Sequence, residues 1–180
     1  MTLPASDEQH LWVSWQDYHQ AIEELALLVH QSDWQFDQVL CLARGGLRPG
    51  DVLSRIFAVP LAILSTSSYR EASGTLQGEL DIGKFIALSK ESLGGRVLLV
   101  DDLVDSGVTL QKVQQYILQQ LPEVSAVRTA VIWCKAGASF SPDFCVQRLA
   151  GMPWIHQPFE VYDDLRPADL AISLPQGDRQ

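Results

Sequence analysis

The segment from residue 96 to residue 120 constrains the fold of this chain more than any other. It begins with the apolar run RVLLV, continues through DDLVDSG, and ends in VTLQKVQQYILQQ, where apolar side chains recur at helical spacing. The run lacks the alternation of polar and apolar residues that a half-exposed strand shows, which indicates a strand buried on both faces of a parallel sheet. The sequence therefore predicts a strand, a loop and a helix in succession, the unit from which α/β folds are built.

The rest of the chain repeats this alternation. Helices are predicted at 14–31 and 47–57, and strands at 39–43, 61–64, 84–88, 126–134 and 144–149. The segment Ser65–Gly83 is rich in Ser, Gly and Thr and is predicted to be a long loop that could serve as a lid. We expect one domain of residues 1–180, an α/β fold with an open, mainly parallel sheet flanked by helices. The less regular residues 150–180 are expected to contribute a cap.

Charge and composition narrow the possible partners. The 180 residues carry a net charge of −9, the wrong sign for non-specific binding to a nucleic acid. The longest uncharged stretch, Ile56–Tyr69, is too short to span a bilayer, and the acidic N-terminus does not resemble a secretory signal. The three cysteines lie in apolar runs without CxxC spacing, which predicts buried thiols. A cytoplasmic protein with no membrane span and no nucleic-acid partner is expected.

Two loops that follow predicted strands are candidates for ligand binding, at Ala43–Gly46 and Asp101–Thr109. Ligands of open α/β sheets bind beyond the carboxyl ends of the strands, where both loops should lie. The second loop ends in the small-residue turn DSGVT at a helix N-terminus, whose free N–H groups and dipole favour a phosphate. The hydroxyl groups of Ser106 and Thr109 can add donors.

Two adjacent acids, Asp101 and Asp102, stand directly before this turn. Neighbouring carboxylates repel each other unless hydroxyl groups or a cation engage them, and the vicinal hydroxyls of a ribose would do so. Acceptors for a diol beside donors for an anion predict a site for a sugar phosphate. The competing interpretation is a solvated acid pair near a helix.

The stretch VLLVDDLVDSGVTL, residues 97–110, resembles the phosphoribosyl pyrophosphate motif of type I phosphoribosyltransferases. ARGGLRPG around Arg44 is similar to the pyrophosphate loop of the bacterial xanthine-guanine enzymes of that family. SSY at 67–69, CKAG around Lys135 and WIHQPFE from Trp154 are similar to further segments, so the resemblance covers most of residues 12–160. Val108 stands where those enzymes usually have a second glycine. The lid segment and the residues after Glu160 have no clear counterpart.

The resemblance implies roles in binding phosphoribosyl pyrophosphate. Asp101 and Asp102 would hold the ribose 2′ and 3′ hydroxyls, with Asp102 also near Mg²⁺. The 5′-phosphate would lie on Asp105, Ser106, Gly107, Val108 and Thr109. Arg44 and Gly45 would contact the pyrophosphate, beside the non-proline cis peptide bond that the family often has there.

The resemblance also implies how a purine is recognised. Asp105 would face N7 as proton acceptor or donor, and Lys135 would donate to the oxygen at C6. Trp154 would stack on the base, and the backbone of Ile155 would read its far edge. On physical grounds alone, Lys135 could be a solvated surface cation and Trp154 could pack in a core or cap.

The expected activity is transfer of a phosphoribosyl group from phosphoribosyl pyrophosphate to a 6-oxopurine with Mg²⁺, in purine salvage. One alternative is a regulator that binds phosphoribosyl pyrophosphate without catalysis, and another is a phosphoribosyltransferase with a different acceptor. Oligomers are usual in the family, so a homo-oligomer is expected, with Trp12 and Trp15 as candidate contacts.

Overall fold

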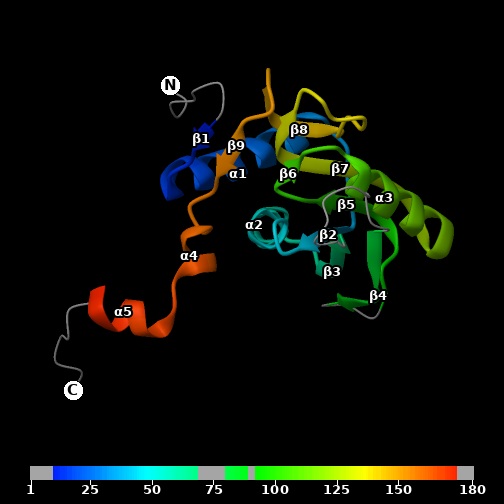
Figure 1. Ribbon diagram of the computed structural model, residues 1–180. Coiled ribbons are helices and arrows are strands. Elements are labelled where there is room, and N and C mark those ends of the chain that lie inside the picture. Colours follow the sequence, from blue (N-terminus) through cyan, green and yellow to red (C-terminus); the bar gives the residue numbers. More distant parts are fainter. Residues whose placement is uncertain (1–9, 69–79, 89–91, 174–180) are drawn as a thin grey trace. The chain divides into compact units, whose positions relative to one another are not determined.

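The computed structural model describes residues 10–68, 80–88 and 92–173 (Figure 1). The chain divides into two compact units. The larger unit comprises Gln20–Met152, and the smaller one joins Met1–His19 to Pro153–Gln180. The expectation that residues 150–180 cap a single domain stays a prediction.

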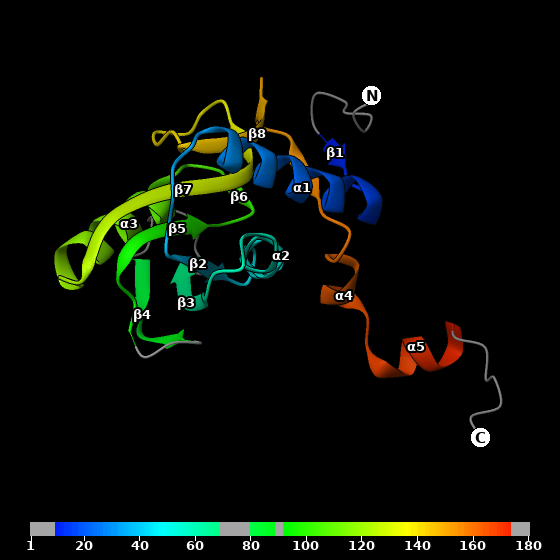
Figure 2. The same cartoon turned by 180° about the vertical axis from the view of Figure 1, so that it is seen from behind.

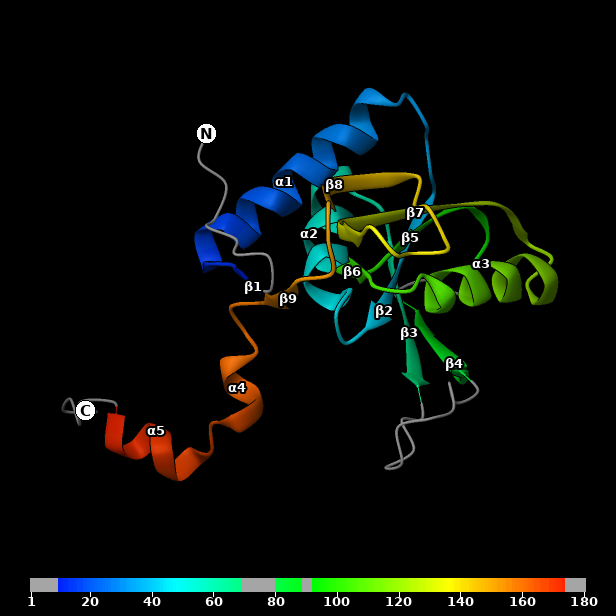
Figure 3. The same ribbon diagram turned by 45° about the horizontal axis from the view of Figure 1, so that its top comes forward.

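A sheet of seven described strands forms the centre of the larger unit. The strands are β2 (Gln38–Ala43), β3 (Leu61–Ser68), β4 (Leu80–Leu88), β5 (Gly95–Val100), β6 (Leu103–Val104), β7 (Val124–Lys135) and β8 (Phe144–Leu149). Their order is β4-β3-β2-β5-β7-β6, and β8 also pairs with β7. Every pairing is parallel except that of β3 with β4. Figure 3 shows β4 and β8 toward opposite ends of this sheet. The predicted α/β fold with a mainly parallel sheet is confirmed.

Helices cover both faces of the sheet. On one face, apolar residues of α3 (Val108–Gln120) join Leu40 and Leu42 of β2 in the main hydrophobic core. On the other face, α2 (Leu47–Phe57) packs on β2 at Cys41. Figures 1 and 2 show the two helices on opposite sides of the sheet. The third helix, α1 (Trp15–Gln31), begins after Ser14, whose Oγ accepts a hydrogen bond from the Asp17 N–H at 3.1 Å.

Strand β5, at the start of the segment 96–120, is buried on both faces, as predicted. All four residues of Val97–Val100 have no exposed surface, although successive side chains of a strand point to opposite faces. Cys41 and Cys134 are buried as well, and Cys145 is partly buried. No helix of the described residues is long and apolar enough to span a membrane.

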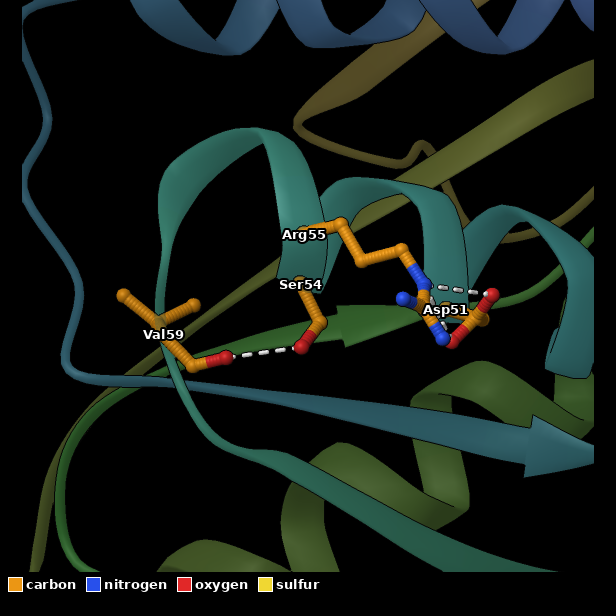
Figure 4. A network of polar contacts seen from close by, with 4 residues as sticks. All are labelled: Asp51, Ser54, Arg55 and Val59. Carbon is orange, nitrogen blue, oxygen red and sulfur yellow. Dashed lines mark hydrogen bonds and ion pairs between the residues drawn. The ribbon is translucent and has the colours of Figure 1, made fainter.

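The end of α2 is held by contacts close in sequence (Figure 4). The Ser54 hydroxyl donates to the Val59 carbonyl at 2.7 Å, and Ala58 takes the left-handed conformation that ends the helix. Arg55 pairs with Asp51 one turn earlier at 3.0 Å, but both side chains are at least half exposed, so this pair adds little stability. These contacts turn the chain directly into β3.

The smaller unit contains a two-stranded parallel sheet of β1 (His10–Trp12) and β9 (Trp154–His156), followed by α4 (Val161–Asp164) and α5 (Pro167–Ser173). The ring of Trp12 stacks on His156 with a centroid distance of 3.6 Å. Trp12 and Trp15 are 62% and 40% exposed. Their role as contacts in a homo-oligomer stays a prediction. The prediction had not included β1, because three residues are too few to show periodicity.

The prediction of a loop over Ser65–Gly83 is wrong at both ends. β3 continues to Ser68 and β4 already begins at Leu80, so the two form an antiparallel pair in which Thr66 lies opposite Ile82. Polar residues on a strand near the sheet edge conceal the apolar pattern that predicts strands. Residues 69–79, the centre of the predicted lid, lie outside the described residues.

Gly50 allows α2 to approach β2 closely. A Cβ atom at this position would lie 2.5 Å from the Cβ of Cys41. We therefore expect Gly50→Ala to lower the free energy of unfolding by about 1–3 kcal/mol through overpacking, which outweighs the gain of up to about 1 kcal/mol from the better helix former. Urea denaturation measures this change. In the control Gly137→Ala, the new Cβ meets only the exposed Met152 side chain, and stability should stay near that of the wild type. Equal stability of both variants would contradict the close packing.

Candidate active site

The carboxyl ends of β2, β5 and β7 lie at one edge of the sheet. Their parallel register places Cys41 level with Val100, and Val100 level with Ala130. The two predicted ligand loops therefore leave neighbouring strands side by side. Parallel pairing brings together residues that are far apart in the sequence, and the candidate site is built on this edge.

Asp101 and Asp102 occupy the gap between β5 and β6, where their backbone is fixed against β7. The Asp101 N–H donates to the Ala130 carbonyl, and the Asp102 carbonyl accepts from the N–H groups of Ile132 and Trp133, all at 3.1 Å. The Asp102 N–H donates to the Asp101 carboxylate at 3.0 Å. Both acids are partly buried, so the interpretation as a freely solvated pair is wrong.

The surroundings of the Asp101 carboxylate disfavour its charged form. Burial, and then the negative charge of Asp102, raises the pKa of Asp101 well above its ordinary value. Hydroxyl donors or a cation would relieve this cost by satisfying the charged forms. The pair is therefore suited to hold a diol, a divalent cation, or both.

The turn from Asp105 to Thr109 leads into α3 with its donors available. Gly107 stands at the start of the helix with a φ of 87°, and no side chain caps the helix there. The Val108 N–H donates to the Ser106 Oγ over a nitrogen–oxygen distance of 3.4 Å, which makes this a weak hydrogen bond. Uncapped N–H groups and the helix dipole favour an anion at this turn, and binding of the 5′-phosphate there stays a prediction.

The loop after β2 lies against the acid pair. The peptide bond between Ala43 and Arg44 is cis, as the resemblance implied. A Cβ atom on Gly45 would collide with the Asp102 carboxylate, so only glycine lets the backbone approach there. Arg44 is exposed at the same edge of the sheet. The structure thus brings Arg44, Gly45 and Asp102 into one constellation.

Lys135 is the last residue of β7 and is only 9% exposed. Its Nζ lies 3.2 Å from the carboxylate of Asp105, which is 58% exposed. The interpretation of Lys135 as a solvated surface cation is therefore wrong. A buried cation and an accessible carboxylate thus form a donor and an acceptor side by side at the start of the turn Asp105–Thr109.

Two residues that the sequence did not single out contact that turn. Ser139 donates to the Ser106 carbonyl, and Phe140 packs against Gly107. Both lie in the loop after β7, which carries no motif of its own. Only the pairing of β6 with β7 places this loop beside the turn.

Trp154 and Ile155 belong to β9 of the smaller unit. The Trp154 side chain is 56% exposed, so it is not buried in a core, whereas Ile155 is buried and lies level with Leu11 of β1. Their roles in holding a base stay predictions.

Comparisons with known proteins identify the family of this chain. The family described as phosphoribosyl transferase domain matches residues 14–164. The xanthine-guanine phosphoribosyltransferase of Idiomarina loihiensis is 28% identical over 155 residues, which cover 86% of this chain and 89% of that protein.

Solved structures share the fold. The xanthine-guanine-hypoxanthine phosphoribosyltransferase of Helicobacter pylori has a TM-score of 0.69 at 20% identity, with 86% of this chain and 97% of that chain covered. The purine phosphoribosyltransferase of Pyrococcus horikoshii has a TM-score of 0.65 at 25% identity, with 81% and 92% covered. The family match extends over most of the chain, including the acid pair, the turn Asp105–Thr109 and the Arg44 loop, and the chain therefore belongs to the phosphoribosyl transferase family and is a phosphoribosyltransferase.

Proposed function

We propose that this enzyme transfers the 5-phosphoribosyl group of phosphoribosyl pyrophosphate to a 6-oxopurine, releasing pyrophosphate in purine salvage. Xanthine, guanine and hypoxanthine are the candidate bases. The observation that carries this proposal is the pairing of buried Lys135 with exposed Asp105. A 6-oxopurine presents an acceptor oxygen at C6 and a protonated nitrogen at N7 on the same edge of its ring system. The donor Lys135 matches the oxygen, and the acceptor Asp105 matches the protonated nitrogen.

The sugar phosphate would be held by the edge of the sheet. Asp101 and Asp102 would accept hydrogen bonds from the ribose hydroxyls, which relieves the cost of two neighbouring carboxylates. The 5′-phosphate would lie on the uncapped start of α3, with donors from Ser106, Gly107, Val108 and Thr109. Arg44 and the backbone of Gly45 would engage the pyrophosphate beside Asp102.

The donor set at this edge fits Mg²⁺. Among the described residues no group of three or more His, Cys, Asp or Glu side chains could hold a metal ion, so an all-protein site is not present there. Mg²⁺ usually binds one or two carboxylates together with substrate phosphates and water, and Asp102 with its neighbour Asp101 could supply the carboxylates. When bound, the ion would offset the negative charge that develops on pyrophosphate.

In the reaction, the C1–oxygen bond breaks and its electron pair leaves with the pyrophosphate, while N9 of the purine forms the new bond to C1. Arg44 would stabilise the departing charge, and Asp105 would take the proton from N7. Lys135 would orient the base through its C6 oxygen. The roles that the resemblance implies for Trp154, in stacking on the base, and for the backbone of Ile155, in reading the group at C2, stay predictions.

The first test measures pyrophosphate release from phosphoribosyl pyrophosphate and Mg²⁺ with xanthine, guanine, hypoxanthine or adenine. We expect turnover with at least one oxopurine, and we expect Asp105→Asn to lower kcat about 10²- to 10⁴-fold, because the proton acceptor is lost. Asp51→Asn is the matched control, since Asp51 pairs with Arg55 on α2 and lies outside the proposed site. If no base reacts while phosphoribosyl pyrophosphate binds, a non-catalytic regulator or a different acceptor replaces this proposal.

A second test concerns the C6 oxygen. Lys135→Ala removes a charged donor, so kcat/KM for the preferred oxopurine should fall about 10- to 100-fold. The affinity for pyrophosphate alone should change little. Lys112→Ala, which removes an exposed lysine on α3, is the control. An unchanged kcat/KM in Lys135→Ala would exclude recognition of the C6 oxygen by this residue.

A third test concerns the pyrophosphate loop. Gly45→Ala forces a Cβ atom against the Asp102 carboxylate, so one of the two must move. We expect the Kd for pyrophosphate with Mg²⁺, measured by calorimetry, to rise at least about 10-fold, because one hydrogen bond to a charged group is lost. Gly94 lies directly before the first residue of β5, at the end of the strand away from the site, so the control Gly94→Ala should bind pyrophosphate as the wild type does. Wild-type affinity in Gly45→Ala would show that the close approach does not matter for pyrophosphate binding.

A further inference from the structure

The loop after β7 is fastened to the phosphate-binding turn. Ser139 donates both its backbone N–H and its hydroxyl to the Ser106 carbonyl, each at 2.9 Å. The next residue, Phe140, lies so close to Gly107 that a Cβ atom there would come within 2.6 Å of the Phe140 Cβ. Three consecutive residues of the turn thus contact the loop, because Asp105 already pairs with Lys135 at its start.

The two bonds from Ser139 determine how one peptide group is oriented. In a trans peptide unit the C=O and the N–H point in opposite directions. When the Ser106 carbonyl is held toward Ser139, the Gly107 N–H must point away from the loop. Within the described part of the chain this N–H has no acceptor, which leaves it available to a ligand.

Gly107 permits this orientation. Its φ of 87° lies in the left-handed region that residues with a side chain rarely adopt, and Phe140 fills the space that a side chain would take. The turn could nevertheless rotate about glycine if nothing held the Ser106 carbonyl. Among the described residues, it is the N–H and the hydroxyl of Ser139 that donate hydrogen bonds to this carbonyl.

We propose that Ser139 is a positioning residue, which aims the Gly107 N–H at the 5′-phosphate by holding the Ser106 carbonyl. This inference rests on the proposed function, since it assigns the phosphate to this turn. Ser139 does not touch the reacting atoms. Its loss therefore weakens binding of the phosphorylated sugar and leaves the chemical step largely intact.

The experiment compares Ser139→Ala with Ser139→Thr, which keeps a hydroxyl donor. We expect Ser139→Ala to raise the KM for phosphoribosyl pyrophosphate and the Kd for ribose 5-phosphate about three- to tenfold, because one hydrogen bond is lost. The kcat and the Kd for pyrophosphate should stay within about twofold of the wild type, since a factor of two is below the value of one hydrogen bond. Ser139→Thr should restore ribose 5-phosphate binding. Ser141→Ala, in the same loop but bonded to Arg148, should leave all these quantities unchanged.

Each outcome is decisive. If Ser139→Ala binds ribose 5-phosphate as the wild type does, or if pyrophosphate binding and melting temperature fall together with it, Ser139 has no specific positioning role and the inference is wrong. Ribose 5-phosphate binding needs no purine, so a wild type that binds it without turning over any base refutes only the proposed acceptor. A wild type that fails to bind ribose 5-phosphate refutes the assignment of the turn and this inference with it.

Discussion

The central strand β5 is hydrogen-bonded to β2 on one side and to β7 on the other, and both pairings are parallel. Parallel pairing makes three chain segments end at the same edge, so their loops meet although the sequence separates them widely. The strand can serve this purpose because its apolar side chains are buried on both faces, and Val97 and Leu99 join the core to which α3 contributes. Every other feature of the site depends on this arrangement.

The proposed substrate, phosphoribosyl pyrophosphate, is a polyanion, whereas the protein has a net charge of −9. Long-range attraction cannot supply the affinity, so it has to come from local donors. We propose that these donors are the uncapped N–H groups at the start of α3, the backbone of the loop at Gly45, and the cation Arg44. Asp101 and Asp102 are instead proposed as acceptors, because ribose hydroxyls and Mg²⁺ need negatively charged oxygens.

Precise placement in this site comes from contacts between loops. Lys135 forms an ion pair with Asp105, and Ser139 donates to the Ser106 carbonyl. Phe140 packs against Gly107, so the contacts follow the same order along both loops. The group proposed to bind the base and the turn proposed to bind the phosphate are thereby held in one frame. Transfer between two substrates requires such a frame, because the reacting atoms must approach within a narrow range of distance.

Local patterns were sufficient for much of this protein. Strand β5, helix α3 and the acids and turn between them were predictable because burial, helical spacing and turn chemistry are written in consecutive residues. The same holds for β2, Arg44 and α2. Where polar residues lie near a sheet edge, as at Thr66 in β3, the local pattern is not sufficient, and the adjoining ends of β3 and β4 are predicted as part of a loop.

The sequence by itself determined the fold class and the residue types that are proposed to bind the phosphate, the ribose and the pyrophosphate. Only the tertiary structure decided that Lys135 is buried against Asp105, that Gly45 must be small because Asp102 lies over it, and that Ser139 holds the Ser106 carbonyl. The reason is physical. Each of these contacts joins loops from different strands, and their distance depends on strand order and register, which no short stretch of sequence encodes.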